Sequence, residues 1–144
     1  MSMRRAAVFV LALAIVASPL AGRPAASAGS FDGHWAVTLT CEKASDGALG
    51  YVFQFPAEVK DGQLHGEHGI AGHPSWLAID GQINSAGDAA ILADGLTGLS
   101  DYNLGRVVQG APYTYRIKAH FDGARGAGTR VSGARACKVE FLKV

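Results

Sequence analysis

The stretch PYTYRIKAHFD, residues 112–122, alternates apolar and polar side chains along its whole length. Successive side chains of a β-strand point to opposite faces, so this alternation predicts a strand with one buried face and one solvent-exposed face. The apolar set consists of Tyr113, Tyr115, Ile117, Ala119 and Phe121. The segment therefore indicates a β-sheet that covers a core on one side.

Similar short runs recur through the chain, and 19 glycines punctuate them. Lys60-Asp61-Gly62, Ser85-Ala86-Gly87 and Asp122-Gly123 have the composition of tight hairpin turns, which join antiparallel strands. No stretch shows a sustained 3.6-residue apolar period, so we predict an all-β domain. The predicted strands are 34–41, 51–59, 63–69, 75–84, 88–97, 112–122, 125–132 and 136–143.

Cys41 ends the first predicted strand, and Cys137 begins the last one. Both fall on the apolar phase of their strands, and neither belongs to a Cys-x-x-Cys pair. A disulfide needs Cα atoms within about 7 Å, which an eight-stranded meander provides when its first and last strands meet. We therefore predict an eight-stranded antiparallel up-and-down barrel closed by a disulfide. A two-sheet β-sandwich with the same link remains the alternative.

The first 28 residues differ in composition from the rest. Arg4 and Arg5 precede the uncharged run 6–20, and Ala26-Ser27-Ala28 fits a signal-peptidase site. The run is shorter than the roughly 20 residues that span a bilayer, which favours a cleaved signal peptide over a membrane anchor. We expect residues 1–28 to be the signal peptide and residues 29–144 to form a single periplasmic or secreted domain.

The charge balance limits the classes of molecule that the protein is expected to bind. The chain has 13 Lys and Arg against 12 Asp and Glu, a formal net charge of +1. Nucleic-acid binding needs a clustered excess of basic residues, which this balance does not provide. We therefore expect no nucleic-acid partner.

The segment Phe31-Asp32-Gly33-His34-Trp35 opens the first predicted strand. A Gly-x-Trp at this place in a small exported barrel resembles the calycins, the group of lipocalins and avidin-like proteins. The resemblance implies that Gly33 lets the chain turn tightly into the strand and that Trp35 plugs one end of the barrel. The mature sequence is also similar to small exported bacterial proteins that begin Phe-Asp-Gly-x-Trp, which implies an export address and this fold.

One local cluster could supply metal ligands: His65, Glu67, His68 and His73. Neutral imidazole and carboxylate are ligands that suit zinc. On a strand, however, His65 and Glu67 share one face while His68 takes the other, so a site would need a local bend. A solvated face is the simpler interpretation, and a zinc-binding or metal-dependent hydrolytic protein is the alternative function.

No Gly-x-Ser-x-Gly motif is present, and both cysteines are expected to be paired, so we expect neither an enzyme nor a bound cofactor. The longest connection, 98–111, has no obvious internal structure, and long loops often carry function. We expect the aromatic side chains to fill the barrel rather than line a large cavity, since eight strands leave little interior room.

The leading functional hypothesis is an exported, non-enzymatic barrel that binds a small ligand or a protein partner through the loops at 70–76 and 98–112. Inhibition of an exported enzyme is one form of this role, by analogy of fold alone. The predicted contact residues are Trp76, Tyr102, Arg106 and Tyr113.

Overall fold

The computed structural model describes residues 28–144. The predicted signal peptide lies outside the described residues, apart from Ala28. The described chain consists of eight strands and three short 3₁₀ helices. The strands are β1 (Gly33–Cys41), β2 (Tyr51–Lys60), β3 (Gln63–His68), β4 (Leu77–Ile83), β5 (Asp88–Leu96), β6 (Pro112–Asp122), β7 (Arg125–Arg130) and β8 (Cys137–Lys143).

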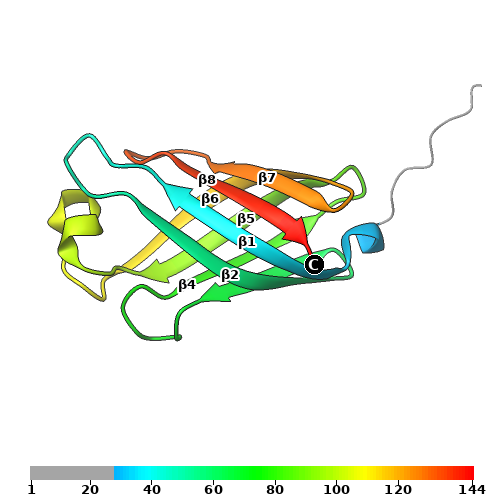
Figure 1. Ribbon diagram of the computed structural model, residues 1–144, viewed down its shortest axis with the longest axis horizontal. Helices are drawn as coiled ribbons and strands as arrows, with labels where there is room; N and C mark the ends of the chain where they lie inside the picture. The colour runs from blue at the N-terminus through cyan, green and yellow to red at the C-terminus, as the bar shows by residue number, and fades with distance from the viewer. Residues whose placement is uncertain (1–27) are drawn as a thin grey trace, which may run out of the picture.

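The eight strands form one closed barrel in which each strand pairs with its neighbours in the chain. Every pairing is antiparallel, and β1 also pairs with β8, from Trp35 opposite Lys143 to Cys41 opposite Cys137 (Figure 1). The predicted up-and-down barrel is confirmed, and the two-sheet sandwich is excluded. The strand ends differ from the predicted ones by at most two residues.

The disulfide between Cys41 and Cys137 joins the first and last strands, as predicted. The two Cα atoms lie 4.1 Å apart, and both side chains are buried. The link therefore holds the seam of the barrel at the end where β1 stops and β8 starts. Closure of the seam also leaves no unpaired edge among the eight described strands.

The inward side chains form one core, and the assignment of faces from the sequence is confirmed. In β6, Ile117 and Phe121 are almost fully buried, while the polar residues between them are exposed. The largest fully buried side chains come from seven strands: Trp35, Val37, Leu39, Val59, Leu64, Leu77, Ile79, Ile83, Ile91, Ile117, Phe121 and Val139.

One end of the barrel, which we call the Trp35 end, is closed by the segment that precedes β1. The 3₁₀ helix η1 (Ala28–Phe31) lies across this end (Figure 1). Trp35 is 1% exposed, and its indole Nε1 donates a hydrogen bond to the carbonyl oxygen of Phe31 over 3.0 Å. Its ring meets Phe121 edge-on, with centroids 5.3 Å apart, and Lys143 Nζ lies 5.8 Å from it. The indole therefore fills the barrel axis at this end.

Asp32 and Gly33 hold this closure in place. The Asp32 carboxylate accepts hydrogen bonds from the backbone N–H groups of Asp61, over 2.8 Å, and Gly62, over 3.1 Å. It therefore caps the β2–β3 turn. Gly33 has a φ of 135°, a conformation that residues with a Cβ rarely adopt. The chain can thus turn from η1 into β1.

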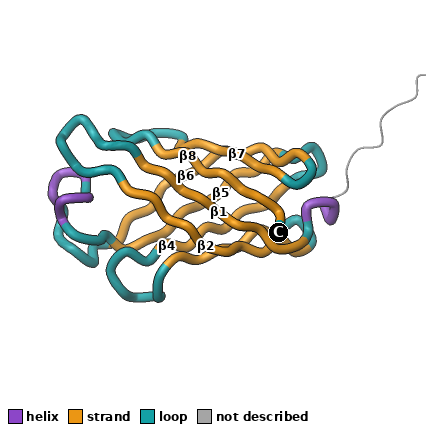
Figure 2. Tube along the Cα trace, viewed as in Figure 1, coloured by secondary structure: helices purple, strands orange, loops and turns teal. Residues whose placement is uncertain are grey.

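The opposite end, which we call the loop end, carries the loops 42–50, 69–76, 97–111 and 131–136. We call 97–111 the capping loop. Its sequence shows no obvious internal structure, but it contains the 3₁₀ helices η2 (Ser100–Tyr102) and η3 (Leu104–Arg106) (Figure 2). Each is a single turn, too short to produce an apolar period in the sequence. Among the described residues, no helix has the length and apolar character needed to cross a membrane.

Candidate functional site

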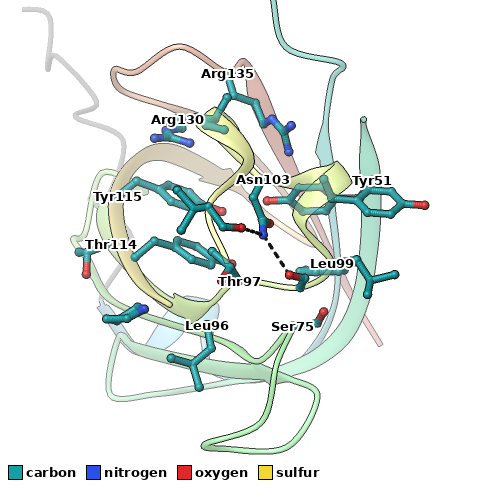
Figure 3. Close-up of a pocket in the computed structure, with 17 residues that line it drawn as sticks. Tyr51, Ser75, Leu96, Thr97, Leu99, Asn103, Thr114, Tyr115, Arg130 and Arg135 are labelled. Carbon is teal, nitrogen blue, oxygen red and sulfur yellow. Dashed lines mark hydrogen bonds between the residues drawn. The ribbon is translucent and has the colours of Figure 1, made fainter. Parts of the chain in front are cut away.

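A cavity of about 380 Å³ lies at the loop end, between the ends of the strands and the capping loop. Figure 3 shows the side chains around it. Tyr51 and Phe53 of β2 and Tyr113 and Tyr115 of β6 supply aromatic walls. The capping loop supplies aliphatic and amide groups above them. The expectation that aromatic side chains fill the whole barrel is therefore replaced by a filled Trp35 end and a hollow loop end.

Gly95 shapes one wall of the cavity. It pairs with Tyr113 in the β5–β6 ladder, and a Cβ on Gly95 would lie 2.5 Å from the Tyr113 hydroxyl oxygen. Only a residue without a side chain lets the Tyr113 ring lie against the sheet in this way. The ring then runs parallel to that of Tyr115, with centroids 6.0 Å apart. The two phenol groups form one continuous aromatic surface.

Arg135 contributes a buried positive charge. Its side chain is 5% exposed, and its guanidinium carbon lies 5.2 Å from the centroid of the Tyr51 ring. Within residues 28–144, its Nε and Nη2 atoms have no hydrogen-bond partner. A buried guanidinium normally has its N–H donors satisfied, since leaving them unpaired is costly. Arg135 is therefore an exceptional group in this fold.

Arg130 brings a second guanidinium to the same wall (Figure 3). Its guanidinium carbon lies 4.5 Å from the centroid of the Tyr115 ring, and its Nε donates to the carbonyl oxygen of Ser132 over 2.8 Å. The Tyr115 hydroxyl is buried and has no hydrogen-bond partner among the described residues. Arg135, Arg130 and the Tyr115 hydroxyl thus each have hydrogen-bond donors on this wall that remain without an acceptor in the described chain.

The cavity wall has a net positive charge. Among the residues that the structure describes, those lining the cavity include two arginines and no carboxylate. Burial raises the pKa values of Tyr113 and Tyr115 far above the ordinary value, and the nearby Tyr51 adds to the effect. Both phenols therefore keep their protons at neutral pH and can donate hydrogen bonds.

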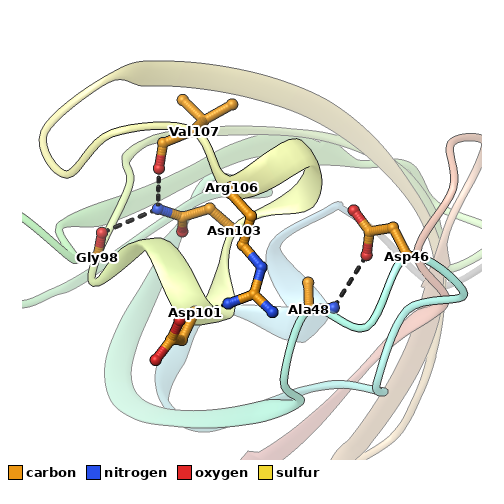
Figure 4. A network of polar contacts seen from close by, with 7 residues as sticks. All are labelled: Asp46, Ala48, Gly98, Asp101, Asn103, Arg106 and Val107. Carbon is orange, nitrogen blue, oxygen red and sulfur yellow. Dashed lines mark hydrogen bonds and ion pairs between the residues drawn. The ribbon is translucent and has the colours of Figure 1, made fainter.

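Hydrogen bonds hold the capping loop over the cavity (Figure 4). Asn103 is buried, and its Nδ2 donates to the carbonyl oxygens of Gly98, over 2.9 Å, and Val107, over 2.8 Å. One amide thereby joins both limbs of the loop. The Thr97 hydroxyl bonds to the carbonyl oxygen of Val108 over 2.6 Å, which closes the base of the loop.

Asp46, in the loop 42–50, ties the capping loop to the rest of the barrel. Its carboxylate accepts hydrogen bonds from the backbone N–H of Gly105, over 2.7 Å, and of Ala48, over 3.0 Å. These two bonds, led by the one from Gly105, lower the pKa of Asp46 below its ordinary value. The capping loop is therefore anchored by a residue 59 positions earlier in the chain.

Two of the four predicted contact residues, Tyr102 and Tyr113, line the cavity. The other two do not. Trp76 lies on the outside of the barrel, where its Nε1 donates to Glu67 Oε2 over 3.3 Å. Arg106 is exposed and forms an ion pair with Asp101. The structure therefore places the four residues in two separate environments.

Arg130 and Arg135 line the cavity but are not among the residues predicted from the sequence. Arg135 lies two positions before Cys137, and Arg130 lies two positions after Gly128. Each therefore falls on the inward phase of its strand when the alternation is extended. An arginine on an inward phase was the signal that could have identified this wall.

The predicted metal ligands are divided between the two sides of the barrel wall. His65 and Glu67 lie together outside, where His65 Nδ1 is 2.7 Å from Asp80 Oδ1 and His65 Nε2 is 3.3 Å from Glu67 Oε1. His68 stacks on Phe53, with ring centroids 3.9 Å apart, while His73 lies in the exposed turn that follows β3. Within residues 28–144, no three His, Cys, Asp or Glu side chains are arranged to hold a metal ion.

No protein-family model matches this chain, and a comparison with curated proteins finds no match. The fold and the site define a small disulfide-closed β-barrel with a cationic, aromatic cavity at one end.

Proposed function

We propose that this protein binds a small, largely apolar molecule in the loop-end cavity. The observation that carries the proposal is the cavity itself, with aromatic walls below and an ordered loop above. Its volume of about 380 Å³ lies in the range of small-molecule sites, which are lined mainly by apolar groups with a few placed polar groups. A molecule of two or three fused or linked rings matches that space.

A binding role without catalysis fits the chemistry of the wall. The described residues that line the cavity offer aromatic, aliphatic, hydroxyl, amide and guanidinium groups. General acid–base catalysis most often uses histidine or a carboxylate, and neither type is part of this lining. The proposal is therefore a carrier or sensor of a small molecule rather than an enzyme.

A protein partner is the second candidate, and exposed apolar side chains at the loop end favour it. Ile70 is 68% exposed, Leu99 is 63% exposed and Val108 is 73% exposed. Apolar side chains exposed at one end of a barrel offer a surface to a protein partner. An exported enzyme that the barrel inhibits would be one partner of this kind.

The metal-dependent alternative has weaker support, because His68 is directed away from His65 and Glu67 and stacks on Phe53. Elemental analysis of protein purified without a His tag separates the two functions. Stoichiometric zinc that is lost in His68→Ala would favour the metal site. Metal-free protein that still binds a small molecule would favour the cavity.

We also propose that the chain is exported to the periplasm or secreted and that its barrel is calycin-like. The disulfide supports an oxidising compartment, and the composition of residues 1–28 supports export. The eight-stranded barrel and the Trp35 plug support the calycin-like relationship. Sequencing the N-terminus of protein recovered from the exporting cell tests the export proposal, which predicts a start at residue 29.

A neutral fluorescent probe tests the binding function. N-phenyl-1-naphthylamine becomes more fluorescent when it leaves water, so a titration reports binding to an apolar cavity. Leu104 lines the cavity and is half-buried, so Leu104→Trp should fill part of it and weaken binding by about tenfold or more. Val108→Trp is the matched control, because Val108 belongs to the same loop and is exposed.

The proposal predicts saturable binding that Leu104→Trp weakens and Val108→Trp leaves within about twofold. Absence of saturable binding, or equal loss in both variants, would overturn it.

A further inference from the structure

The buried guanidinium of Arg135 identifies the chemistry of the ligand. Arg135 is only 5% exposed, so its Nε and Nη2 donors are shielded from solvent. Within residues 28–144, neither donor has a hydrogen-bond partner. A buried charge whose donors remain unpaired is strongly unfavourable, and a complementary anion removes that penalty. The fold thus holds a cationic group whose free donors need an acceptor from outside the described chain, and an anion also neutralises its charge.

The surroundings of Arg135 strengthen the requirement for an anion. Arg130 places a second guanidinium on the same wall, so the two like charges repel each other (Figure 3). The nearest tyrosines, Tyr51 and Tyr115, hold these groups by their ring faces, at 5.2 Å and 4.5 Å. A ring face is attractive to a cation but accepts no strong hydrogen bond in the guanidinium plane. Nε and Nη2 of Arg135 therefore remain available to a ligand, as do the terminal nitrogens of Arg130, whose Nε is already bonded to the Ser132 carbonyl oxygen.

Tyr115 supplies a further donor. Its hydroxyl is buried without a partner among the described residues. Since burial also raises the pKa of this phenol, the group stays protonated and donates to an anion rather than repelling it.

We propose that the ligand is an organic carboxylate with an apolar, preferably aromatic body, and that Arg135 and Arg130 bind its carboxylate. Tyr115 donates a third hydrogen bond, and the stacked rings of Tyr113 and Tyr115 pack against the apolar body. This inference rests on the proposed function. Guanidinium groups bind carboxylates through two parallel hydrogen bonds, which accounts for arginine rather than lysine on this wall.

The apolar remainder of the cavity argues for a singly charged ligand. Beyond the two arginines, the described lining is dominated by aromatic and aliphatic side chains. A small, highly charged anion such as inorganic phosphate would leave this surface uncovered and would lose more hydration on entry. In a carboxylate joined to a ring system, the charged group pairs with the arginines while the rings cover the apolar lining.

A pair of isosteric probes tests the inference. Isothermal titration calorimetry compares 2-naphthoate with 2-naphthamide, which has nearly the same shape and no charge. We expect the wild-type protein to bind 2-naphthoate at least about tenfold more tightly. Arg135→Met should abolish that preference while N-phenyl-1-naphthylamine still binds.

Two further variants make the result interpretable. Arg130→Gln should reduce the preference for 2-naphthoate without emptying the core, so it serves if Arg135→Met fails to fold. Arg116→Gln removes an exposed positive charge from the outer face of β6 and should leave the preference unchanged.

Equal affinities for the two probes in wild-type protein would overturn the inference. A preference that Arg116→Gln reduces as much as Arg130→Gln does would also overturn it, because the charge effect would then be general. Binding of the neutral fluorescent probe alone would leave the proposed function standing and this inference refuted. Failure of all three probes would refute both.

Discussion

Cys41 lies directly opposite Tyr51 in the β1–β2 ladder, and its disulfide partner Cys137 begins the strand that follows Arg135. The guanidinium of Arg135 and the ring of Tyr51 face each other across this corner of the barrel. One covalent link thus anchors both residues. It closes the barrel seam and also fixes one wall of the cavity.

Removing the disulfide should lower both stability and affinity. The link spans 96 residues, and loss of a native disulfide from a small domain typically costs about 2–4 kcal/mol. We expect Cys41→Ser/Cys137→Ser to lower the free energy of unfolding in urea by this amount and to weaken 2-naphthoate binding. Reduced wild-type protein is the matched control and should behave like the variant. Unchanged affinity in a folded variant would show that the link does not position the wall.

Asn103 should control the order of the capping loop. Asn103→Ala removes two hydrogen bonds and leaves the carbonyl groups of Gly98 and Val107 without their donor, a loss of about 1–3 kcal/mol. We expect faster amide hydrogen exchange in residues 97–111 and weaker binding of the neutral probe. Arg106→Gln breaks an exposed ion pair in the same loop and should cost at most about 1 kcal/mol. Equal exchange rates in the two variants would contradict this account of the loop.

The Asp32 cap should contribute to stability at the Trp35 end. Asp32→Ala leaves the N–H groups of Asp61 and Gly62 without their acceptor, and we expect the free energy of unfolding to fall by about 1 kcal/mol. Asp122→Ala, an exposed carboxylate in another hairpin at the same end, is the control. Affinity for 2-naphthoate should not change in either variant, since the cavity lies at the opposite end. A larger loss from Asp122→Ala would contradict the assignment of Asp32 as the cap.

His65 should titrate above the ordinary histidine value of 6.5. The hydrogen bond that His65 Nδ1 donates to the Asp80 carboxylate is the main cause of the raised pKa, and the charges of Asp80 and Glu67 add to it. Because the folded-state pKa is raised, the stabilisation is fully present below pH 6.5 and is lost as the pH rises through the folded value. The effect on stability should be small, since the side chain is more than half exposed.

Proton NMR of the His65 ring across the pH range measures this shift directly. Asp80→Asn should bring the pKa back toward 6.5. A titration that Asp80→Asn does not alter would rule out this ion pair.

The sequence was sufficient for the strands and the seam, because both depend on local rules. Alternation in residues 112–122 marked the inward face of β6, and the inward phase of Cys41 and Cys137 identified the closing pair. The shape of the cavity was not accessible in this way. It depends on the capping loop, whose position is set by the bond between Asp46 and Gly105 across 59 residues.

The position of each side chain along the barrel axis was a second feature that the sequence could not predict. Alternation shows that Tyr113 and Phe121 share a face but not how far along the barrel each one lies. In the structure Phe121 packs on Trp35 at the filled end, while Tyr113 borders the cavity at the other. Alternation predicts that Trp76 faces outward, and Arg106 lies in the long loop; the structure places both outside the cavity.

Mapping a bound probe residue by residue shows whether the loop-end cavity holds the ligand. In a nitrogen-15 NMR titration with 2-naphthoate, we expect the largest amide shifts at Tyr51, Tyr115 and Arg135 and along the capping loop. The exposed lysines Lys118 and Lys138 on the outer faces of β6 and β8 should show little change. Shifts confined to such outer residues, with the cavity amides unmoved, would contradict the claim that this cavity is the binding site.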